Sequence, residues 1–129
     1  MRYVLIVDDV LTNLEITKRM LLPYSIRVDC ANSGQEAIDA VREEKVIYNA
    51  IFMDHMMPDI DGLEATRIIR EEIGTEYAKT VPIIAFTANT LPGIKEFFLN
   101  NGFQGFISKP IDTARLDALL RKWVFNEKS

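Results

Sequence analysis

The chain has 129 residues, of which 48% are hydrophobic, so it can bury a core without disulfides or a structural metal. Its formal net charge of −4, from 15 basic and 19 acidic residues, argues against direct binding to nucleic acid or to an anionic membrane. The single cysteine, Cys30, cannot form an internal disulfide, and its strand-like surroundings predict a small buried thiol. We therefore expect one domain, residues 1–129, in a reducing, cytoplasmic setting.

Five short apolar runs alternate with longer stretches of helical spacing, starting with residues 3–7, which are too few for a signal peptide or membrane span. This alternation predicts an α/β fold of five βα units, in which helices cover both faces of a parallel sheet. The expected strands are Tyr3–Asp8, Ile26–Ala31, Ala50–Asp54, Ile83–Phe86 and Gly105–Ile107. The five helices are expected to bury Leu14, Met20, Ile38, Val41, Leu63, Ile68, Phe97, Leu116 and Leu120.

Local signals mark several helix ends. Two capping boxes, Thr12-x-x-Glu15 and Ser33-x-x-Glu36, predict helix starts. Pro92 suits a first helical turn and Asn101-Gly102 suits a helix end, so a helix is expected from about residue 91 to residue 100. Gly74 is expected to end the third helix.

Acidic residues follow two of the expected strands. Asp8 and Asp9 end the first strand, and Asp54 ends the third. In a parallel sheet these carboxylates meet at the carboxyl edge, where open α/β sheets bind their ligands. Unpaired carboxylates in one crevice repel each other, which either raises a pKa or attracts a hard cation with oxygen ligands. The pattern therefore predicts a Mg²⁺ site.

Thr87 ends the fourth expected strand and Lys109 follows the fifth, so both are expected at the same edge. The charges of three carboxylates, one ammonium group and a divalent cation sum to zero, so the site would accept the negative charge of an incoming phosphoryl group. Phosphoryl transfer needs positioning and charge neutralisation, which Mg²⁺, Lys109 and the Thr87 hydroxyl can supply. We expect Asp54 to be the nucleophile, and an aspartate nucleophile forms a mixed anhydride.

At this point the sequence resembles the response-regulator receiver domains of bacterial two-component systems over nearly its whole length. The matching segments, each at the end of an apolar strand, are Val7-Asp8-Asp9, Met53-Asp54-x-x-Met57-Pro58-x-x-Asp61-Gly62, Thr87-Ala88 and Lys109-Pro110. The resemblance implies a flavodoxin-like, doubly wound sheet of strand order 2-1-3-4-5. It implies phosphorelay signalling by a switch that is not a turnover enzyme.

The resemblance also assigns roles to residues. It implies that Asp54 is the phosphoacceptor and that Asp9, Asp54 and the Met56 backbone carbonyl bind Mg²⁺, for which Mn²⁺ can substitute, while Asp8 helps through water. Lys109 is expected to pair with the phosphoryl group and to precede a cis peptide bond to Pro110. The resemblance also implies that two residues move together as the switch, Thr87 and Phe106.

The implied partners are of two kinds. A histidine kinase or histidine phosphotransfer domain donates the phosphoryl group, and a downstream partner binds the face made by the fourth helix, fifth strand and fifth helix. No direct nucleic-acid contact and no membrane contact are expected. Asn13, Met57-Pro58 and residues 85–89 resemble the receivers of hybrid histidine kinases, so we favour a piece of such a kinase over a free-standing regulator.

The chain departs from the family pattern in a few places. Val10 replaces a polar residue that many relatives have, and Phe106 replaces the commoner tyrosine, so no hydroxyl holds its outward state. His55 is expected to point away from Asp54 as a structural or solvated side chain. The soft thioethers do not suit Mg²⁺, so we expect core packing for Met53, Met56 and Met57.

Met56 and Asn89 lie two residues beyond Asp54 and Thr87, where side chains are best placed to guide a hydrolytic water. Met56 is apolar, and Asn89 cannot act as a charged base. We therefore expect a long-lived phosphoaspartate.

Three alternatives stay open. Asp59-x-Asp61-Gly62 superficially matches the nucleophile motif of a D-x-D-G phosphatase, but Pro58 precedes it where an apolar strand is needed. The same residues match part of a calcium loop, but Leu63–Ile69 lack its further ligands. The third is a receiver-like interaction module that is never phosphorylated.

Overall fold

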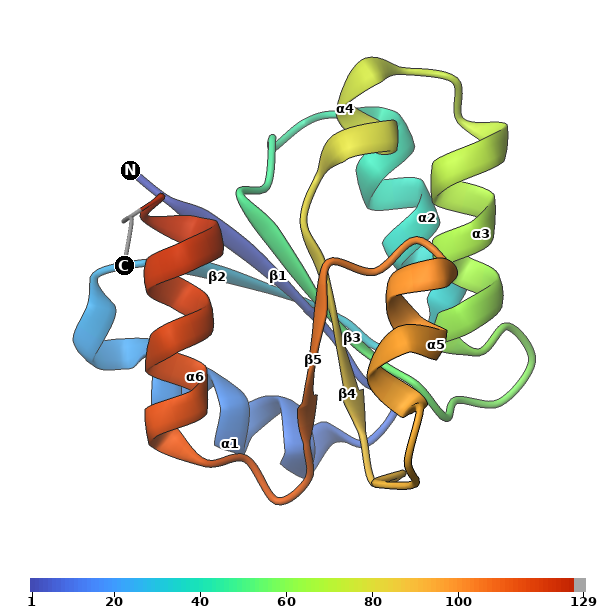
Figure 1. The fold of residues 1–129 in the computed structure, drawn as a ribbon. Coiled ribbons are helices and arrows are strands. Elements are labelled where there is room, and N and C mark those ends of the chain that lie inside the picture. The colour runs from blue at the N-terminus through green and yellow to red at the C-terminus, as the bar shows by residue number, and fades with distance from the viewer. Residues whose placement is uncertain (127–129) are drawn as a thin grey trace.

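The computed structural model describes residues 1–126. All five strands lie in one parallel sheet of order β2-β1-β3-β4-β5, which confirms the predicted order (Figure 1). Each strand lies within one residue of its predicted bounds at both ends: β1 (Tyr3–Val7), β2 (Arg27–Ala31), β3 (Ala50–Asp54), β4 (Ile83–Thr87) and β5 (Gly105–Ser108).

Residues 1–126 form six α-helices: α1 (Leu11–Leu21), α2 (Gly34–Glu43), α3 (Gly62–Glu72), α4 (Glu76–Thr80), α5 (Ile94–Asn100) and α6 (Thr113–Leu119). A 3-10 turn, Leu22–Tyr24, follows α1, and a π-helical turn, Leu120–Val124, continues α6. The prediction of five helices was therefore wrong, because it missed α4. This helix has only five residues, too few to show a helical period in the sequence.

Alternate residues of each strand point to opposite faces, and the helices divide between these faces (Figure 1). Leu5 and Val7 of β1 belong to the core beneath α2, α3, α4 and α5. Val4 and Ile6 belong to the other core, beneath α1 and α6. The sheet is therefore covered on both sides, and its carboxyl edge is left to the loops.

One predicted capping box is confirmed and the other was wrong. Ser33 accepts a hydrogen bond from the Glu36 backbone N–H at 3.1 Å and begins α2. In contrast, α1 begins at Leu11, one residue before Thr12, and has no side-chain cap. The Asp8 carboxylate accepts from the Val10 backbone N–H at 2.9 Å, so the turn leaving β1 starts the helix early.

The start of α5 also differs from the prediction. Gly93, with φ of +87°, precedes the helix, so α5 begins at Ile94 and Pro92 lies outside it. As a result Phe97, predicted to be buried, is 40% exposed, and its neighbour Phe98 is fully buried.

Other burial predictions were wrong as well. The Cys30 thiol is exposed. Met20, Leu63 and Ile68 are only half-buried at the edges of the two cores. Gly74 does follow α3, with φ of +89°. None of the helices between residues 1 and 126 is both long and apolar enough to cross a membrane.

We expect Phe98→Ala to lower the free energy of unfolding by about 3–5 kcal/mol, because it leaves a cavity beside the sheet. Phe97→Ala, on the same helix, is the matched control and should cost about 1 kcal/mol or less. Urea denaturation followed by circular dichroism measures both. Equal losses would contradict the assignment of Phe98, and not Phe97, to the core.

Candidate functional site

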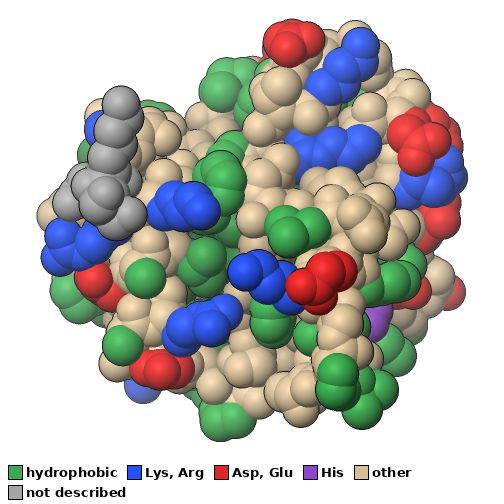
Figure 2. Space-filling view, in the orientation of Figure 1, with side chains coloured by type: hydrophobic (Ala, Val, Ile, Leu, Met, Phe, Trp, Pro, Cys, Tyr) green, Lys and Arg blue, Asp and Glu red, His purple; other side chains and the backbone are tan. Residues whose placement is uncertain are grey.

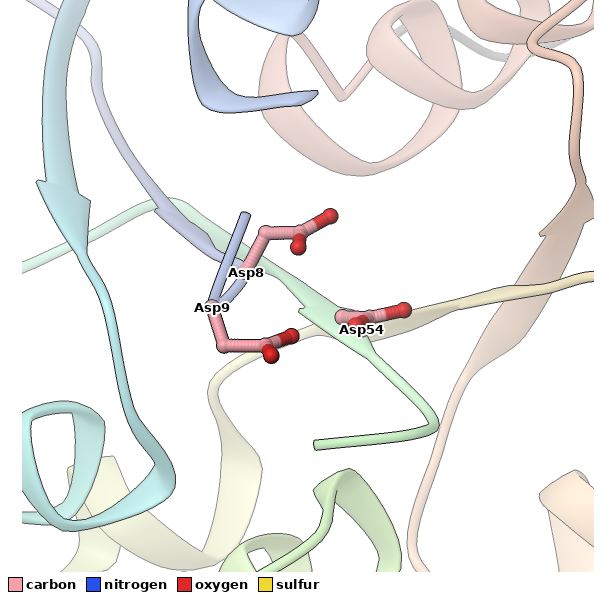
Figure 3. Close-up of side chains that lie close together, drawn as sticks. All are labelled: Asp8, Asp9 and Asp54. Atoms are coloured by element: carbon pink, nitrogen blue, oxygen red, sulfur yellow. The ribbon is translucent and has the colours of Figure 1, made fainter. Parts of the chain in front are cut away.

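Three carboxylates gather at the carboxyl edge of the sheet. Asp8 and Asp9 directly follow β1, and Asp54 is the last residue of the neighbouring strand β3. One oxygen from each carboxylate lies within 4.8 Å of the others, and the three side chains extend toward a common space (Figure 3). Asp8 and Asp54 are 2% and 5% exposed, whereas Asp9 faces solvent. The structure thus brings together the acidic residues that the sequence singled out.

Lys109 reaches this cluster from the loop after β5. Its Nζ donates to Asp54 Oδ1 at 2.8 Å and to Asp8 Oδ2 at 3.3 Å. The Lys109 backbone N–H donates to the Thr87 carbonyl at 2.8 Å, which holds this loop against the end of β4. The Lys109–Pro110 peptide bond is cis. Lys109 therefore supplies a positive charge to two of the three carboxylates.

The charges of the cluster shift two pKa values. Burial raises the pKa of the Asp54 carboxyl, and the negative charges of Asp8 and Asp9 add to this rise, while the hydrogen bond from Lys109 opposes it. Burial lowers the pKa of Lys109, but its hydrogen bond to Asp54 and the charges of Asp54 and Asp8 outweigh burial and raise it. Lys109 therefore keeps its proton, and the Asp54 carboxyl is harder to ionise than an ordinary, exposed aspartate.

The loop after β3 closes tightly over Asp54. The Gly62 N–H donates to the His55 carbonyl at 3.0 Å, and a Cβ at Gly62 would lie 2.1 Å from the Asp54 carbonyl oxygen. Only glycine fits there. Asp61 caps α3 by accepting from the Glu64 N–H at 2.8 Å, and Asp59 is exposed. Neither carboxylate of the D-x-D-G motif belongs to the acidic cluster.

Thr87 is buried beside the cluster, and its hydroxyl is engaged elsewhere. It accepts from the Asn89 backbone N–H at 3.0 Å and lies 3.3 Å from His55 Nδ1. No hydrogen bond in the described part of the chain joins this hydroxyl to Asp54. The Asn89 side chain accepts from the Leu91 N–H at 3.0 Å and so stabilises its own loop.

The contact between His55 and Thr87 was not predicted. His55 was expected to be structural or solvated, and it is half-buried against a residue of the site. The sequence offered one signal, since His55 directly follows the expected strand that ends at Asp54. In the structure the His55 backbone N–H donates to the Phe86 carbonyl of β4, one residue before Thr87. Which rotamer places the ring against Thr87 depends on packing that the sequence does not reveal.

Phe106 of β5 is half-buried between two side chains. Its ring stacks on Phe98 at 6.2 Å between centroids, and the Arg115 guanidinium lies 5.6 Å from its ring centre. Arg115 also donates to the Phe106 carbonyl at 3.1 Å. A cation thus contacts the aromatic face of a residue that has no hydroxyl of its own.

The methionines near Asp54 differ in burial. Met53 is fully buried and Met57 is 9% exposed, as core packing predicts, but Met56 is 71% exposed. The prediction of core packing was therefore wrong for Met56. Its side chain faces solvent from the loop that follows Asp54.

The cluster is chemically suited to a hard divalent cation and a phosphoryl group. Carboxylate oxygens are the ligands that Mg²⁺ prefers, and three converge here. The cluster carries −3 from its carboxylates and +1 from Lys109, a sum of −2 that one divalent cation balances. Asp54 could then act as a nucleophile among positive charges.

Comparisons with known proteins agree with this geometry. The model of the response regulator receiver domain family matches residues 4–121. Over 124 residues the chain is 40% identical to the osmosensing histidine protein kinase SLN1 of Saccharomyces cerevisiae, covering 93% of this chain and 10% of that protein. Hybrid signal transduction histidine kinase M of Dictyostelium discoideum is 36% identical over 124 residues, covering 96% of this chain and 5% of that protein.

Solved structures are also similar. The receiver domain of the sensor histidine kinase PA1611 from Pseudomonas aeruginosa, which has a magnesium ion in its active-site cleft, has a TM-score of 0.81 and 35% identity, covering 95% of this chain and 96% of that one. The Ssk1 receiver of Saccharomyces cerevisiae, solved with the phosphotransfer protein Ypd1, has a TM-score of 0.83 and 29% identity, covering 96% and 89%. Together with the acidic cluster and the sheet order, these matches show that the chain belongs to the response regulator receiver domain family.

Proposed function

We propose that Asp54 accepts a phosphoryl group from a phosphohistidine partner in a Mg²⁺-dependent reaction, and that the phosphorylated domain changes conformation. The observation that carries this proposal is the buried Asp54 carboxylate, which has the Lys109 ammonium at 2.8 Å and two further carboxylates beside it. Such a site matches the needs of phosphoryl transfer, which depends on positioning and charge neutralisation. The Ypd1-bound Ssk1 receiver supports a histidine phosphotransfer partner.

Asp9, Asp54 and the Met56 carbonyl would hold the metal directly, and Asp8 would hold it through water. No hydrogen bond within residues 1–126 ends on the Met56 carbonyl, so this oxygen is available as a ligand. When bound, Mg²⁺ supplies positive charge next to the phosphoryl oxygens, and Mn²⁺ has similar preferences for oxygen ligands. The magnesium-containing PA1611 receiver supports this assignment.

In the transfer step an oxygen of Asp54 attacks the phosphorus atom, and a P–O bond forms as the P–N bond to the donor imidazole breaks. The electron pair of the P–N bond stays on the imidazole nitrogen. Lys109 is already hydrogen-bonded to Asp54, and its ammonium group would then pair with the negatively charged phosphoryl oxygens. The domain is modified by its own chemistry, so it acts as a switch and not as a turnover enzyme.

The switch would use Thr87 and Phe106. A phosphoryl oxygen on Asp54 would draw the Thr87 hydroxyl toward it, and Phe106 would turn into the space left behind. Because α4 is an additional helix, the downstream face predicted from the sequence corresponds to α5, β5 and α6. Figure 2 shows basic and hydrophobic side chains together on the side of the molecule where these elements lie, which suits a protein partner.

The phosphohistidine partner would dock beside α1. Leu11 and Ile16 of this helix are 70% and 55% exposed, although both are apolar. A hollow of about 240 Å³ is lined by Ile16, Met20, Asp8 and Lys109 among others, so it connects Ile16 of this helix with the acidic cluster. An apolar surface at the rim of a charged site favours a partner that brings one reactive side chain to that site.

We infer that residues 1–129 are a single receiver domain from a hybrid histidine kinase. The curated relatives described above support this, since the chain spans 5% and 10% of their lengths. The phosphatase alternative is disfavoured because Asp61 caps a helix and Asp59 faces solvent. The interaction module without phosphorylation gains no support, since all five key residues are present: Asp8, Asp9, Asp54, Thr87 and Lys109.

Asp54→Asn should abolish phosphate incorporation from acetyl phosphate without loss of the fold, because the amide is nearly isosteric but a poor nucleophile. The matched control is Asp59→Asn, which removes an exposed carboxylate of the D-x-D-G motif at a positive φ that asparagine tolerates. Intact-mass measurement gives the stoichiometry, and circular dichroism checks the fold. Full labelling of the Asp54 variant would refute the assignment, and loss of phosphate chemistry only in the Asp59 variant would favour the phosphatase.

Mg²⁺ should stabilise the parent by about 2.7 kcal/mol at a concentration one hundred times its Kd, and a chelator should reverse this. Asp9→Ala should weaken the effect strongly and Asp8→Ala less. Asp39→Ala should leave it unchanged, because this carboxylate of α2 pairs with Arg42 and lies outside the acidic cluster. Thermal unfolding with and without Mg²⁺ measures the difference. Identical Mg²⁺ titrations for the parent and the Asp9 variant would rule out this site.

The affinity for Mg²⁺ should also depend on pH. Burial raises the pKa of Asp54, so protons compete with the metal at a higher pH than at an ordinary aspartate. Binding should be complete above this raised pKa and weaken as the pH falls through it. An affinity that stayed constant until the pH range of ordinary, exposed aspartates would contradict the role of the buried carboxylate.

Hydrolysis of phospho-Asp54 should be slow in the parent and faster by about tenfold or more in Met56→Asn and Asn89→Glu, which add polar groups that can orient water. Leu91→Asn, in the loop that carries Asn89, is the control. Decay of the purified phosphoprotein gives each rate. If both variants decayed like the parent, neither side chain would govern the attacking water.

A further inference from the structure

We propose that His55 is a positioning residue for the switch: it holds the Thr87 hydroxyl in the unphosphorylated state and links Thr87 to Phe106 through Phe98. This inference rests on the proposed function, because it concerns how Thr87 is released when Asp54 is phosphorylated. The contact that carries it is between His55 Nδ1 and Thr87 Oγ1, which are 3.3 Å apart.

The proton and one lone pair of the Thr87 hydroxyl are engaged in this arrangement. A hydroxyl has one proton to donate and two lone pairs. The Asn89 N–H donates to one lone pair at 3.0 Å, so the hydroxyl proton can point to Nδ1 of an imidazole that carries its own proton on Nε2. Thr87 is 2% exposed, so water cannot easily replace either partner. A phosphoryl oxygen on Asp54 must therefore compete with His55 for the same proton.

The ring of His55 connects this hydroxyl to the aromatic residues of the switch. It packs against Phe98 in a T-shaped arrangement, with centroids 5.2 Å apart and an interplanar angle of 87°. Phe98 is fully buried and stacks on Phe106, with centroids 6.2 Å apart. These contacts form a continuous series from Thr87 through His55 and Phe98 to Phe106, so release of the hydroxyl frees a ring that packs against the same phenylalanine as Phe106.

The distance between His55 Nδ1 and Thr87 Oγ1 is long, which is typical of a weak hydrogen bond that another acceptor can replace. At 3.3 Å it lies beyond the usual range for hydrogen bonds of this kind. His55 is also half-buried, and Figure 2 shows part of the histidine (purple) at the surface. The ring therefore has room to turn once Thr87 leaves it. A weak hydrogen bond of this kind favours the unphosphorylated position of Thr87 without preventing its movement toward Asp54.

The chain has a single histidine, so one pair of imidazole ¹⁵N signals reports on His55 without assignment. The experiment uses the full chain with Mg²⁺ at a mildly alkaline pH, where imidazoles are neutral, and beryllofluoride as the stand-in for the phosphoryl group. We expect beryllofluoride to move the Nδ1 signal toward that of an imidazole nitrogen with no hydrogen bond, together with changes at Phe106. Thr87→Val should move the Nδ1 signal in the same direction without beryllofluoride.

Two variants of similar shape separate hydrogen bonding from packing. His55→Leu removes the acceptor, so the beryllofluoride concentration that half-saturates the switch should fall by about two- to tenfold, the worth of one hydrogen bond. His55→Asn keeps an acceptor near the position of Nδ1 and should restore the behaviour of the parent. Circular dichroism establishes that both variants fold.

Each outcome bears on one claim. If the parent binds beryllofluoride but its Nδ1 signal does not move, or if the Leu and Asn variants respond alike, the role of His55 is wrong and the proposed function stands. An unchanged Nδ1 signal in Thr87→Val would also overturn the role of His55, even if the His55 variants failed to fold. If the parent does not bind beryllofluoride, the proposed function fails and this inference fails with it.

Discussion

The contact between Lys109 and Asp54 is the interaction on which the site depends. Three carboxylates share one edge of the sheet, and two of them are almost completely buried. Burial and the charges of its two neighbours raise the pKa of Asp54, and Lys109 opposes this rise by pairing with Asp54 and Asp8. The residual charge of −2 makes the site ready for a divalent cation. In the function that we propose, the stability lost at this edge is what would make the domain responsive to a metal ion and a phosphoryl group.

The sheet order accounts for why these residues meet. Because β1 lies between β2 and β3, and β4 joins β3 to β5, the ends of β1, β3, β4 and β5 form one continuous edge. The meeting of these strand ends could be predicted from the sequence, because short apolar runs are each followed by acidic, hydroxyl or basic residues. The helix α4 was not predictable in the same way. It depends on the Thr75 cap and on Arg70 in the last turn of α3, which donates to the Ala78 carbonyl at 3.0 Å.

The parts of the site that the sequence missed all depend on side-chain packing. Backbone position follows from periodicity, so Asp8, Asp54 and Lys109 could be placed without a structure. Which of two adjacent phenylalanines enters the core depends on where α5 begins, and Gly93 shifts that start by several residues. The contact of His55 with Thr87 likewise requires Phe98 to be buried beneath the ring. An error in the start of this helix therefore hides the connection between the site and the aromatic residues.

The switch that we propose can work only if its two states are close in free energy. In the unphosphorylated arrangement the Thr87 hydroxyl bonds to neutral partners, each worth about 0.5–1.5 kcal/mol net. A bond from the same hydroxyl to a charged phosphoryl oxygen is worth about 1.5–3 kcal/mol, so the exchange gains about 1–2 kcal/mol. That difference changes a population ratio by a factor of about 5–30, enough to shift the balance but not to abolish the minor state. A charged partner in the place of His55 would hold Thr87 about as strongly as the phosphoryl group does, and phosphorylation would then release nothing.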